Sequence, residues 1–222
     1  MAQSHEAGTE VPEYLYEPLP RGQFIRMLTL HPGAPDDPLR GELEFFDLDR
    51  PSDESNDILD RQYEPVSYVW GAPDRSHEII CNGQRLAVTS SIHGALQRLR
   101  HLDRPRRVWV DQISINQRDL AERSQQVQFM NTIYKNASHV LVWLGPDQNN
   151  MAAQAFKLVS KLQEIFHDEE KSRQFGVDPI RLLETQSEDP WVPLRALTAL
   201  PWVSMHPDDC MVQHWWPIST SC

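Results

Sequence analysis

The sequence of 222 residues has few cysteines, namely Cys81, Cys210 and Cys222. Three widely spaced thiols are too few for a disulfide framework or a zinc ribbon, and they favour a reducing compartment. The polar N-terminus, MAQSHEAGTEVPEY, lacks the apolar core of a secretory signal. No apolar run approaches the ~18–20 residues of a membrane helix. These absences predict a cytoplasmic protein without a membrane segment.

Several patterns that mark particular chemistries are also missing. The nine histidines show no metal-ligand spacing, so no metal site is predicted. A phosphate loop, a nucleophile elbow and a Rossmann glycine pattern are absent, and no cofactor is evident. Positive charge is scarce, because the net charge is −11 and ten of the acidic residues fall within 36–60. This balance argues against a nucleic-acid partner.

Short apolar segments and amphipathic helical patterns alternate along the middle of the chain. The Asn82-Gly83 pair predicts a β-hairpin near 77–89. The pattern indicates an α/β fold, with a mainly parallel sheet flanked by helices. Before it we predict a disordered lead over 1–22, N-terminal strands at 23–30 and 41–48, and an acidic loop over 49–62. The remaining expected elements are a strand at 66–70, a helix from Ser90 or Ser91 through Leu102, a strand at 108–110, a helix at 119–137, a strand at 139–144 and a helix at 149–168.

Polar residues follow the predicted core strands at their carboxyl ends, where parallel sheets place their working sites. Asp111 comes directly after a buried strand, and the predicted helix at 119–137 carries Arg123 within its apolar stripe. A buried arginine needs an anion, and we predict Asp111 as its partner. These polar residues could form a hydrogen-bonded network that fixes the fold. Alternatively, they could form the floor of a nucleotide or small-anion pocket. The full candidate set is Ser67, Tyr68, Trp70, Asp111, Asn116, Gln117, Arg123 and Gln126.

Glu122 is the candidate catalytic acid on that helix. However, Asp119 and Glu122 have the Asp-x-x-Glu spacing of a helix capping box. The capping role explains Glu122 without any chemistry, and it is the favoured reading.

Several ordered blocks resemble the heterokaryon-incompatibility (HET) domain of filamentous fungi. They are YEPVSYVWGAPD at 63–74, the Ile-x-Cys-Asn-Gly hairpin, GALQRLR at 94–100 and VWVDQISINQRDLAERSQQVQFMNTIYKNASHVLVWLG at 108–145. The resemblance covers 63–145, fades towards 202 and is absent after that. One departure is Ser114, where the family usually has cysteine. The resemblance implies one HET-type domain over 23–202, with its core at 63–145.

The resemblance also implies a function. HET domains act in vegetative incompatibility and trigger growth arrest or cell death after a non-self cue. They are distantly similar to TIR domains, which signal by self-association and in some cases cleave NAD. The expected partners are therefore copies of this chain or other cell-death signalling proteins. Cleavage of NAD or a related nucleotide as substrate is the alternative.

The C-terminal residues depart from the family pattern. A Trp-x-x-Gln-Glu motif is expected after 190–202, but the chain continues as VSMHPDDCMVQHWWPISTSC. We therefore expect 203–222 to be an aberrant tail, translated from an intron or a shifted frame, that is not part of the fold. A third reading follows, in which the chain is a truncated and inactive gene product.

Overall fold

The computed structural model describes residues 11–49, 62–147, 150–167, 191–200 and 203. The chain divides into two compact units, Met1–Trp143 and Leu144–Cys222. The boundary falls inside the single domain that the sequence predicts over 23–202. Most of the acidic loop and, apart from Val203, the predicted aberrant tail lie outside the described residues.

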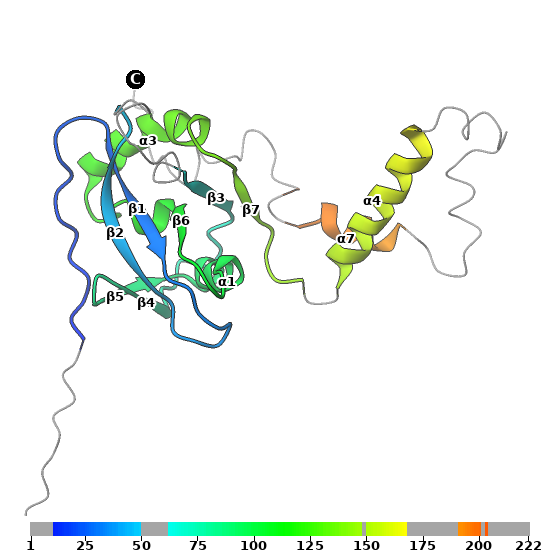
Figure 1. The fold of residues 1–222 in the computed structure, drawn as a ribbon, viewed down its shortest axis with the longest axis horizontal. Coiled ribbons are helices and arrows are strands. Elements are labelled where there is room, and N and C mark those ends of the chain that lie inside the picture. Colours follow the sequence, from blue (N-terminus) through cyan, green and yellow to red (C-terminus); the bar gives the residue numbers. More distant parts are fainter. Residues whose placement is uncertain (1–10, 50–61, 148–149, 168–190, 201–202, 204–222) are drawn as a thin grey trace, which may run out of the picture. The chain divides into compact units, whose positions relative to one another are not determined.

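The first unit is built on a seven-stranded mixed sheet with the order β5-β4-β2-β1-β6-β3-β7 (Figure 1). β3 pairs in parallel with both β6 and β7, as the strand–helix alternation predicts. β1 is antiparallel to β2 and β6, so the N-terminal strands fill the centre of the sheet. The α/β prediction is therefore confirmed. The strand bounds are β1 Phe24–Leu30, β2 Arg40–Asp47, β3 Glu64–Tyr68, β4 His77–Cys81, β5 Gln84–Val88, β6 Arg106–Trp109 and β7 Leu141–Trp143.

The predicted hairpin is β4 and β5, which pair antiparallel. Its turn residues Asn82 and Gly83 have φ values of 50° and 76°. Both values lie in the left-handed region that a two-residue hairpin turn requires, which explains why asparagine and glycine stand there. β4 also pairs in parallel with β2, and this pairing attaches the hairpin to the rest of the sheet.

Helix α1 (Ser90–Leu99) covers one face of the sheet. Its Ile92, Ala95 and Leu96 are buried against the core, as the apolar spacing predicts. The helix ends at Leu99, so the expectation that Leu102 belongs to its buried face is wrong; Leu102 is 73% exposed. The N-cap is Thr89 rather than Ser90 or Ser91.

Helix α3 (Leu120–Lys135) packs on the opposite face. Side chains alternate along a strand, and on β6 Val108 joins the α1-side core while Trp109 faces the other way. Trp109 meets Tyr134 of α3 edge to face, with ring centroids 6.2 Å apart. The Tyr63 hydroxyl donates to the carbonyl oxygen of Ile133 at 2.7 Å. The sheet is therefore covered on both faces.

Residues 11–17 correct the prediction of a disordered lead over 1–22. They run beside β5, where Glu13 and Arg85 form a parallel bridge. Tyr14 and Tyr16 pack against the core cluster, whereas Leu15 between them is exposed. This alternation is a strand pattern, but three prolines nearby hide it from sequence reasoning. Residues 1–10 lie outside the described part of the chain.

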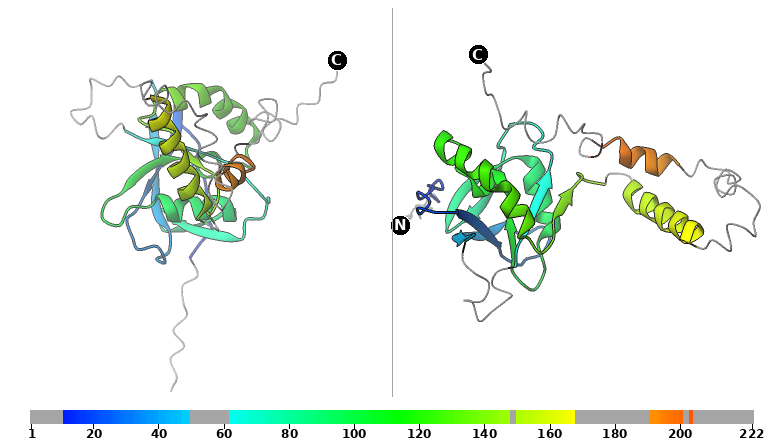
Figure 2. Two further views of the ribbon diagram at one scale, coloured as in Figure 1. Left: turned by 90° about the vertical axis from the view of Figure 1, so that its right-hand side faces the viewer. Right: turned by 90° about the horizontal axis from the view of Figure 1, so that it is seen from above.

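The second unit contains α4 (Met151–His167) and α7 (Val192–Thr198). The two helices lie side by side in every view (Figure 2). Ala155 and Leu158 are buried on α4, as predicted for the apolar face of a helix over 149–168, whereas Val159 of that predicted face is 42% exposed. None of the described helices has the length and apolar character needed to cross a membrane.

Candidate functional site

Asp111 lies where the β6 strand ends and the four-residue helix α2 (Asp111–Ser114) begins. The hydroxyl of Tyr68 donates to Asp111 Oδ1 at 2.7 Å, and Trp70 Nε1 donates to Oδ2 at 3.0 Å. Tyr68 and Trp70 belong to the carboxyl end of β3, the parallel neighbour of β6. The two strand ends thus converge on one carboxylate, and three of the predicted site residues come together.

The Asp111 carboxylate is buried, and its hydrogen-bond donors among the described residues are all neutral. Its exposed fraction is 7%. Burial raises the pKa of Asp111 to about 6, while hydrogen bonds from Tyr68, Trp70 and the Gln112 backbone N–H act in the opposite direction. The pKa of Tyr68 is raised well above 10, first by burial and then by the neighbouring Asp111. Asp111 can therefore gain or lose a proton near neutral pH, whereas Tyr68 stays protonated.

The predicted pairing of Asp111 with Arg123 is wrong. The Asp111 carboxylate faces β3, and Arg123 is not among its partners. Arg123 is half-buried, and its Nε has no hydrogen-bond partner within the described part of the chain. On α3 the fully covered polar side chains are instead Glu122 and Gln126. The apolar spacing therefore places Gln126 correctly on the buried side of the helix, but it is wrong for Arg123 and for Leu120, which is 71% exposed.

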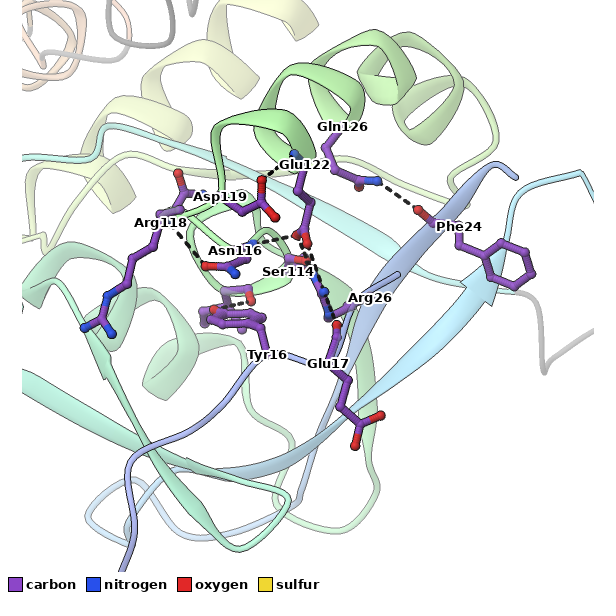
Figure 3. A network of polar contacts seen from close by, with 12 residues as sticks. Tyr16, Glu17, Phe24, Arg26, Ser114, Asn116, Arg118, Asp119, Glu122 and Gln126 are labelled. Atoms are coloured by element: carbon purple, nitrogen blue, oxygen red, sulfur yellow. Dashed lines mark hydrogen bonds and ion pairs between the residues drawn. The ribbon is translucent and has the colours of Figure 1, made fainter. Parts of the chain in front are cut away.

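The buried arginine of this region is Arg26 on β1 (Figure 3). Its Nη1 lies 2.6 Å from Glu122 Oε1, and its Nη2 lies 3.0 Å from Glu122 Oε2. The side chains are only 2% and 8% exposed. Arg26 also donates to the carbonyl oxygens of Ser114 and Glu17. This two-pronged pair ties the centre of the sheet to the first turn of α3.

Glu122 forms only part of the predicted capping box. The Asp119 side chain does cap α3, accepting from the backbone N–H groups of Ala121 and Glu122 at 2.9 and 3.0 Å. Glu122, however, does not reach back to the N-cap residue. Its Oε1 accepts from the Asn116 backbone N–H at 2.7 Å, because Arg26 draws the carboxylate towards the sheet. The residue that sequence patterns present as a cap or a catalytic acid is the anion of a buried ion pair.

Of the other predicted residues, Asn116 and Gln117 fasten the loop between β6 and α3, and Gln126 ties α3 to β1. Asn116 Oδ1 accepts from the Arg118 backbone N–H at 3.1 Å, which is the side-chain bond of an asparagine turn. Gln117 Nε2 donates to the Asp111 carbonyl oxygen at 2.9 Å. Gln126 is fully buried, and its Nε2 donates to the Phe24 carbonyl oxygen at 2.8 Å.

Ser67 stands apart from the Asp111 cluster. It lies between Val66 and Tyr68 on β3, so its side chain points to the opposite face of the sheet. Its exposed fraction is intermediate, and in the sheet register it stands beside Val142 of β7. Ser67 therefore does not contribute to the group formed by Tyr68, Trp70 and Asp111.

Sequence reasoning missed Arg26, although a signal was available. Arg26 interrupts the apolar run FIRMLTL of a strand that occupies the centre of the sheet. An arginine at such a position must find an anion, because the cost of burying an unpaired charge is large. The acid that satisfies it is 96 residues away in sequence, so only the fold identifies the pair.

The chemical capacity of this region is modest. Asp111 is the group placed to exchange a proton, and it is enclosed by two aromatic side chains. The carboxylate of Glu122 is already matched by Arg26. In the part of the chain that the structure describes, no three side chains of His, Cys, Asp or Glu gather to hold a metal ion.

Comparison with known proteins gives two matches. The sequence model described as heterokaryon incompatibility protein (HET) matches residues 63–204. "Heterokaryon incompatibility protein 6, OR allele" of Neurospora crassa is 38% identical over 145 residues, which covers 58% of this chain and 21% of that protein. The chain thus matches about a fifth of the length of this relative. No solved structure matches the chain.

Proposed function

Because the chain belongs to the heterokaryon incompatibility (HET) family, we propose that it acts in vegetative incompatibility as a signalling module. In this role it promotes growth arrest or cell death by binding copies of itself or other signalling proteins. The proposal assigns the effect to association and not to a reaction at the strand ends.

The observation that carries this proposal is the internal use of both buried carboxylates. Glu122 accepts two bonds from Arg26 and one from the Asn116 backbone. Asp111 accepts from Tyr68, Trp70 and the Gln112 backbone. A carboxylate engaged in this way must break good hydrogen bonds before it can contact a substrate, and each such bond to a charged group contributes about 1.5–3 kcal/mol. The arrangement favours a structural role for the two residues.

A second candidate function is cleavage of NAD or a related nucleotide, as in some TIR domains. The specific observation in its favour is Asp111, a carboxyl group with a pKa of about 6 at the carboxyl ends of two parallel strands. A general acid or base works best when its pKa is close to the working pH. Asp111 is therefore the residue whose substitution separates the two candidates.

The test is inducible expression of the full chain in a filamentous fungus, with growth and viability followed after induction. We expect arrest with the wild-type chain and with Asp111→Asn, because the variant keeps the side-chain shape while losing the ionisable group. The amounts of the two chains are matched by immunoblot, and their folding is compared by circular dichroism. Arrest that disappears in a folded Asp111→Asn chain contradicts the proposal and favours the enzyme.

A further inference from the structure

The outer edge of β5 is occupied by the chain's own N-terminal segment, residues 11–17, which passes beside it (Figure 1). The backbone N–H of Tyr14 donates to the Arg85 carbonyl oxygen at 2.7 Å, and the Arg85 N–H donates to the Pro12 carbonyl oxygen at 2.8 Å. Two side-chain bonds, from Arg85 Nε to Val11 and from the Leu15 N–H to Gln84, add to this ladder. The segment therefore forms a short added strand, paired with β5 at one parallel bridge, in the manner in which sheet edges accept extended peptides.

Two tyrosines set the register of the segment. Tyr14 and Tyr16 meet edge to face with ring centroids 4.9 Å apart. The Tyr16 hydroxyl donates to the Ile113 carbonyl oxygen at 2.8 Å, and the Arg26 guanidinium lies 5.0 Å from the centre of the Tyr16 ring. Tyr14 packs against the core cluster and the Tyr16 contacts lie on α2 and β1, so the surface beside the β5 edge accepts a tyrosine at every second position of the segment.

Few side chains of the segment are buried. Apart from Tyr14 and Tyr16, every residue from Val11 to Glu17 is exposed. Removing the segment breaks the bonds from Arg26 to the Glu17 carbonyl oxygen and from Tyr16 to the Ile113 carbonyl oxygen. The Arg26–Glu122 pair remains, because its atoms belong to β1 and α3. Segments with few buried contacts open at a lower free energy than the rest of a fold. The added strand can therefore leave β5 while the sheet persists.

A short hinge connects this strand to β1. Pro18 and Pro20 lack the N–H that a continued ladder needs, and Gly22 turns the chain at a φ of +116°. Elements joined by short hinges are those that identical chains exchange, because the exchanged contacts are the same as the original ones. Only the hinge and the protein concentration then decide between the closed monomer and the exchanged dimer.

We propose that residues 11–17 of one copy bind the β5 edge of a second copy, in exchange for that copy's own segment. This inference rests on the association proposed above and names the surface through which a second copy binds. The occupant is a second copy because the edge is already matched to the Tyr14–Tyr16 spacing of this chain.

The test uses two full-length chains that each carry one engineered cysteine, in a background of Cys210→Ser and Cys222→Ser. One chain carries Glu13→Cys and the other Arg85→Cys, the two positions that face each other in the parallel bridge. Because each chain carries a single engineered cysteine, a yield of disulfide between the two chains above the level of random cross-linking requires exchange. A third chain with Gln97→Cys, an exposed position on α1, measures random cross-linking.

Mixing and mild oxidation are expected to give several-fold more disulfide with the Arg85→Cys chain than with the Gln97→Cys chain. Equal yields would overturn the exchange. If the wild-type chain nevertheless sediments as a dimer, the proposed function keeps its association and only this surface is wrong. If it stays monomeric at all concentrations, self-association fails together with the exchange.

Hinge variants without engineered cysteines provide a second measurement. Deleting Leu19 and Pro20 shortens the path from the segment to β1, so the chain can no longer reach its own β5 edge. We expect this variant to sediment mainly as a dimer. Inserting four Gly/Ser residues after Pro20 relaxes the closed monomer and should shift the population towards it. Exchange is contradicted if the two changes leave the dimer fraction where it is in the wild type.

Discussion

The two buried carboxylates near the loop between β6 and α3 differ in what holds them. Glu122 is matched by a guanidinium, with both oxygens bound to Arg26. Asp111 is matched by a phenol, an indole and a backbone amide, none of which carries a positive charge. Two carboxylates that are close together in sequence can therefore have different roles. Glu122 holds the fold, whereas Asp111 is the group whose charge changes near neutral pH.

The largest effect is expected from breaking the Arg26–Glu122 pair. Arg26→Met leaves a buried carboxylate without its cation, and Glu122→Gln leaves a buried guanidinium without its anion. Each should lower the free energy of unfolding by about 3–5 kcal/mol, because an uncompensated buried charge remains. Urea denaturation measures the loss. The double variant Arg26→Met/Glu122→Leu should recover a large part of the lost free energy, since no charge is then left buried. A double variant that loses the sum of the two single losses would contradict a direct pairing.

A smaller effect is expected from Asp111→Asn, of about 1–3 kcal/mol at neutral pH. The amide presents a donor where the carboxylate accepted from Tyr68 or Trp70. The effect should depend on pH in a defined direction. Because the folded pKa of about 6 lies above the reference value of 3.8, protonation of Asp111 favours the folded state.

This linkage contributes stability that is fully present below about pH 4 and is lost as the pH rises through about 6. The wild type should therefore gain stability relative to Asp111→Asn when the pH falls from 7 to 5. Denaturation curves of both chains at several pH values measure the change, and the comparison cancels the titration of the other carboxylates. A stability difference between the wild type and Asp111→Asn that is constant with pH would mean that Asp111 titrates outside this pH range.

Tyr68→Phe should cost about 1–2 kcal/mol, since it removes one hydroxyl donor and leaves a buried acceptor less satisfied. The Tyr68 bond lowers the pKa of Asp111, so its loss should raise that pKa further above 6. The pH at which stability changes would move upward accordingly. Tyr134→Phe is the matched control, because the Tyr134 hydroxyl is not a donor to Asp111. An equal shift in both variants would show that general packing, and not the hydrogen bond, sets the pKa.

The smallest effect is expected for the Arg118–Glu13 pair, which has the same chemistry as Arg26–Glu122 at the surface. Its side chains are 85% and 64% exposed and lie 3.0 Å apart. Arg118→Ala should change the free energy of unfolding by less than about 0.5 kcal/mol, and the difference should vanish in high salt. If Arg118→Ala lowered the free energy of unfolding as much as Arg26→Met, burial would not explain the difference between the two ion pairs.

Local signals in the sequence predicted the framework well. The Asn82-Gly83 turn, the apolar spacing of α1 and the parallel core strands are all confirmed, because each depends on neighbouring residues or on a simple topological rule. The convergence of Asp111 with Tyr68 and Trp70 followed from the same rule, as these residues end adjacent parallel strands.

The partners of the buried charges could not be predicted in the same way. Arg26 and Glu122 are separated by 96 residues, and no local sequence pattern indicates that β1 lies at the centre of the sheet. The apolar stripe predicts Arg123 as the buried arginine and so pairs it with Asp111, whereas the structure leaves Arg123 half-buried. Residues 11–17 were missed for a similar reason, since their partner strand β5 lies about seventy residues further along the chain.

We propose that the buried carboxylates of Asp111 and Glu122 serve the fold and that the chain signals by association. The most direct test is proton NMR of NAD incubated with the purified full-length chain at several pH values between 5.5 and 8. We expect no release of nicotinamide above that of a protein-free blank, for the wild type and for Asp111→Asn alike. Release by the wild type that is lost in a folded Asp111→Asn chain would contradict it.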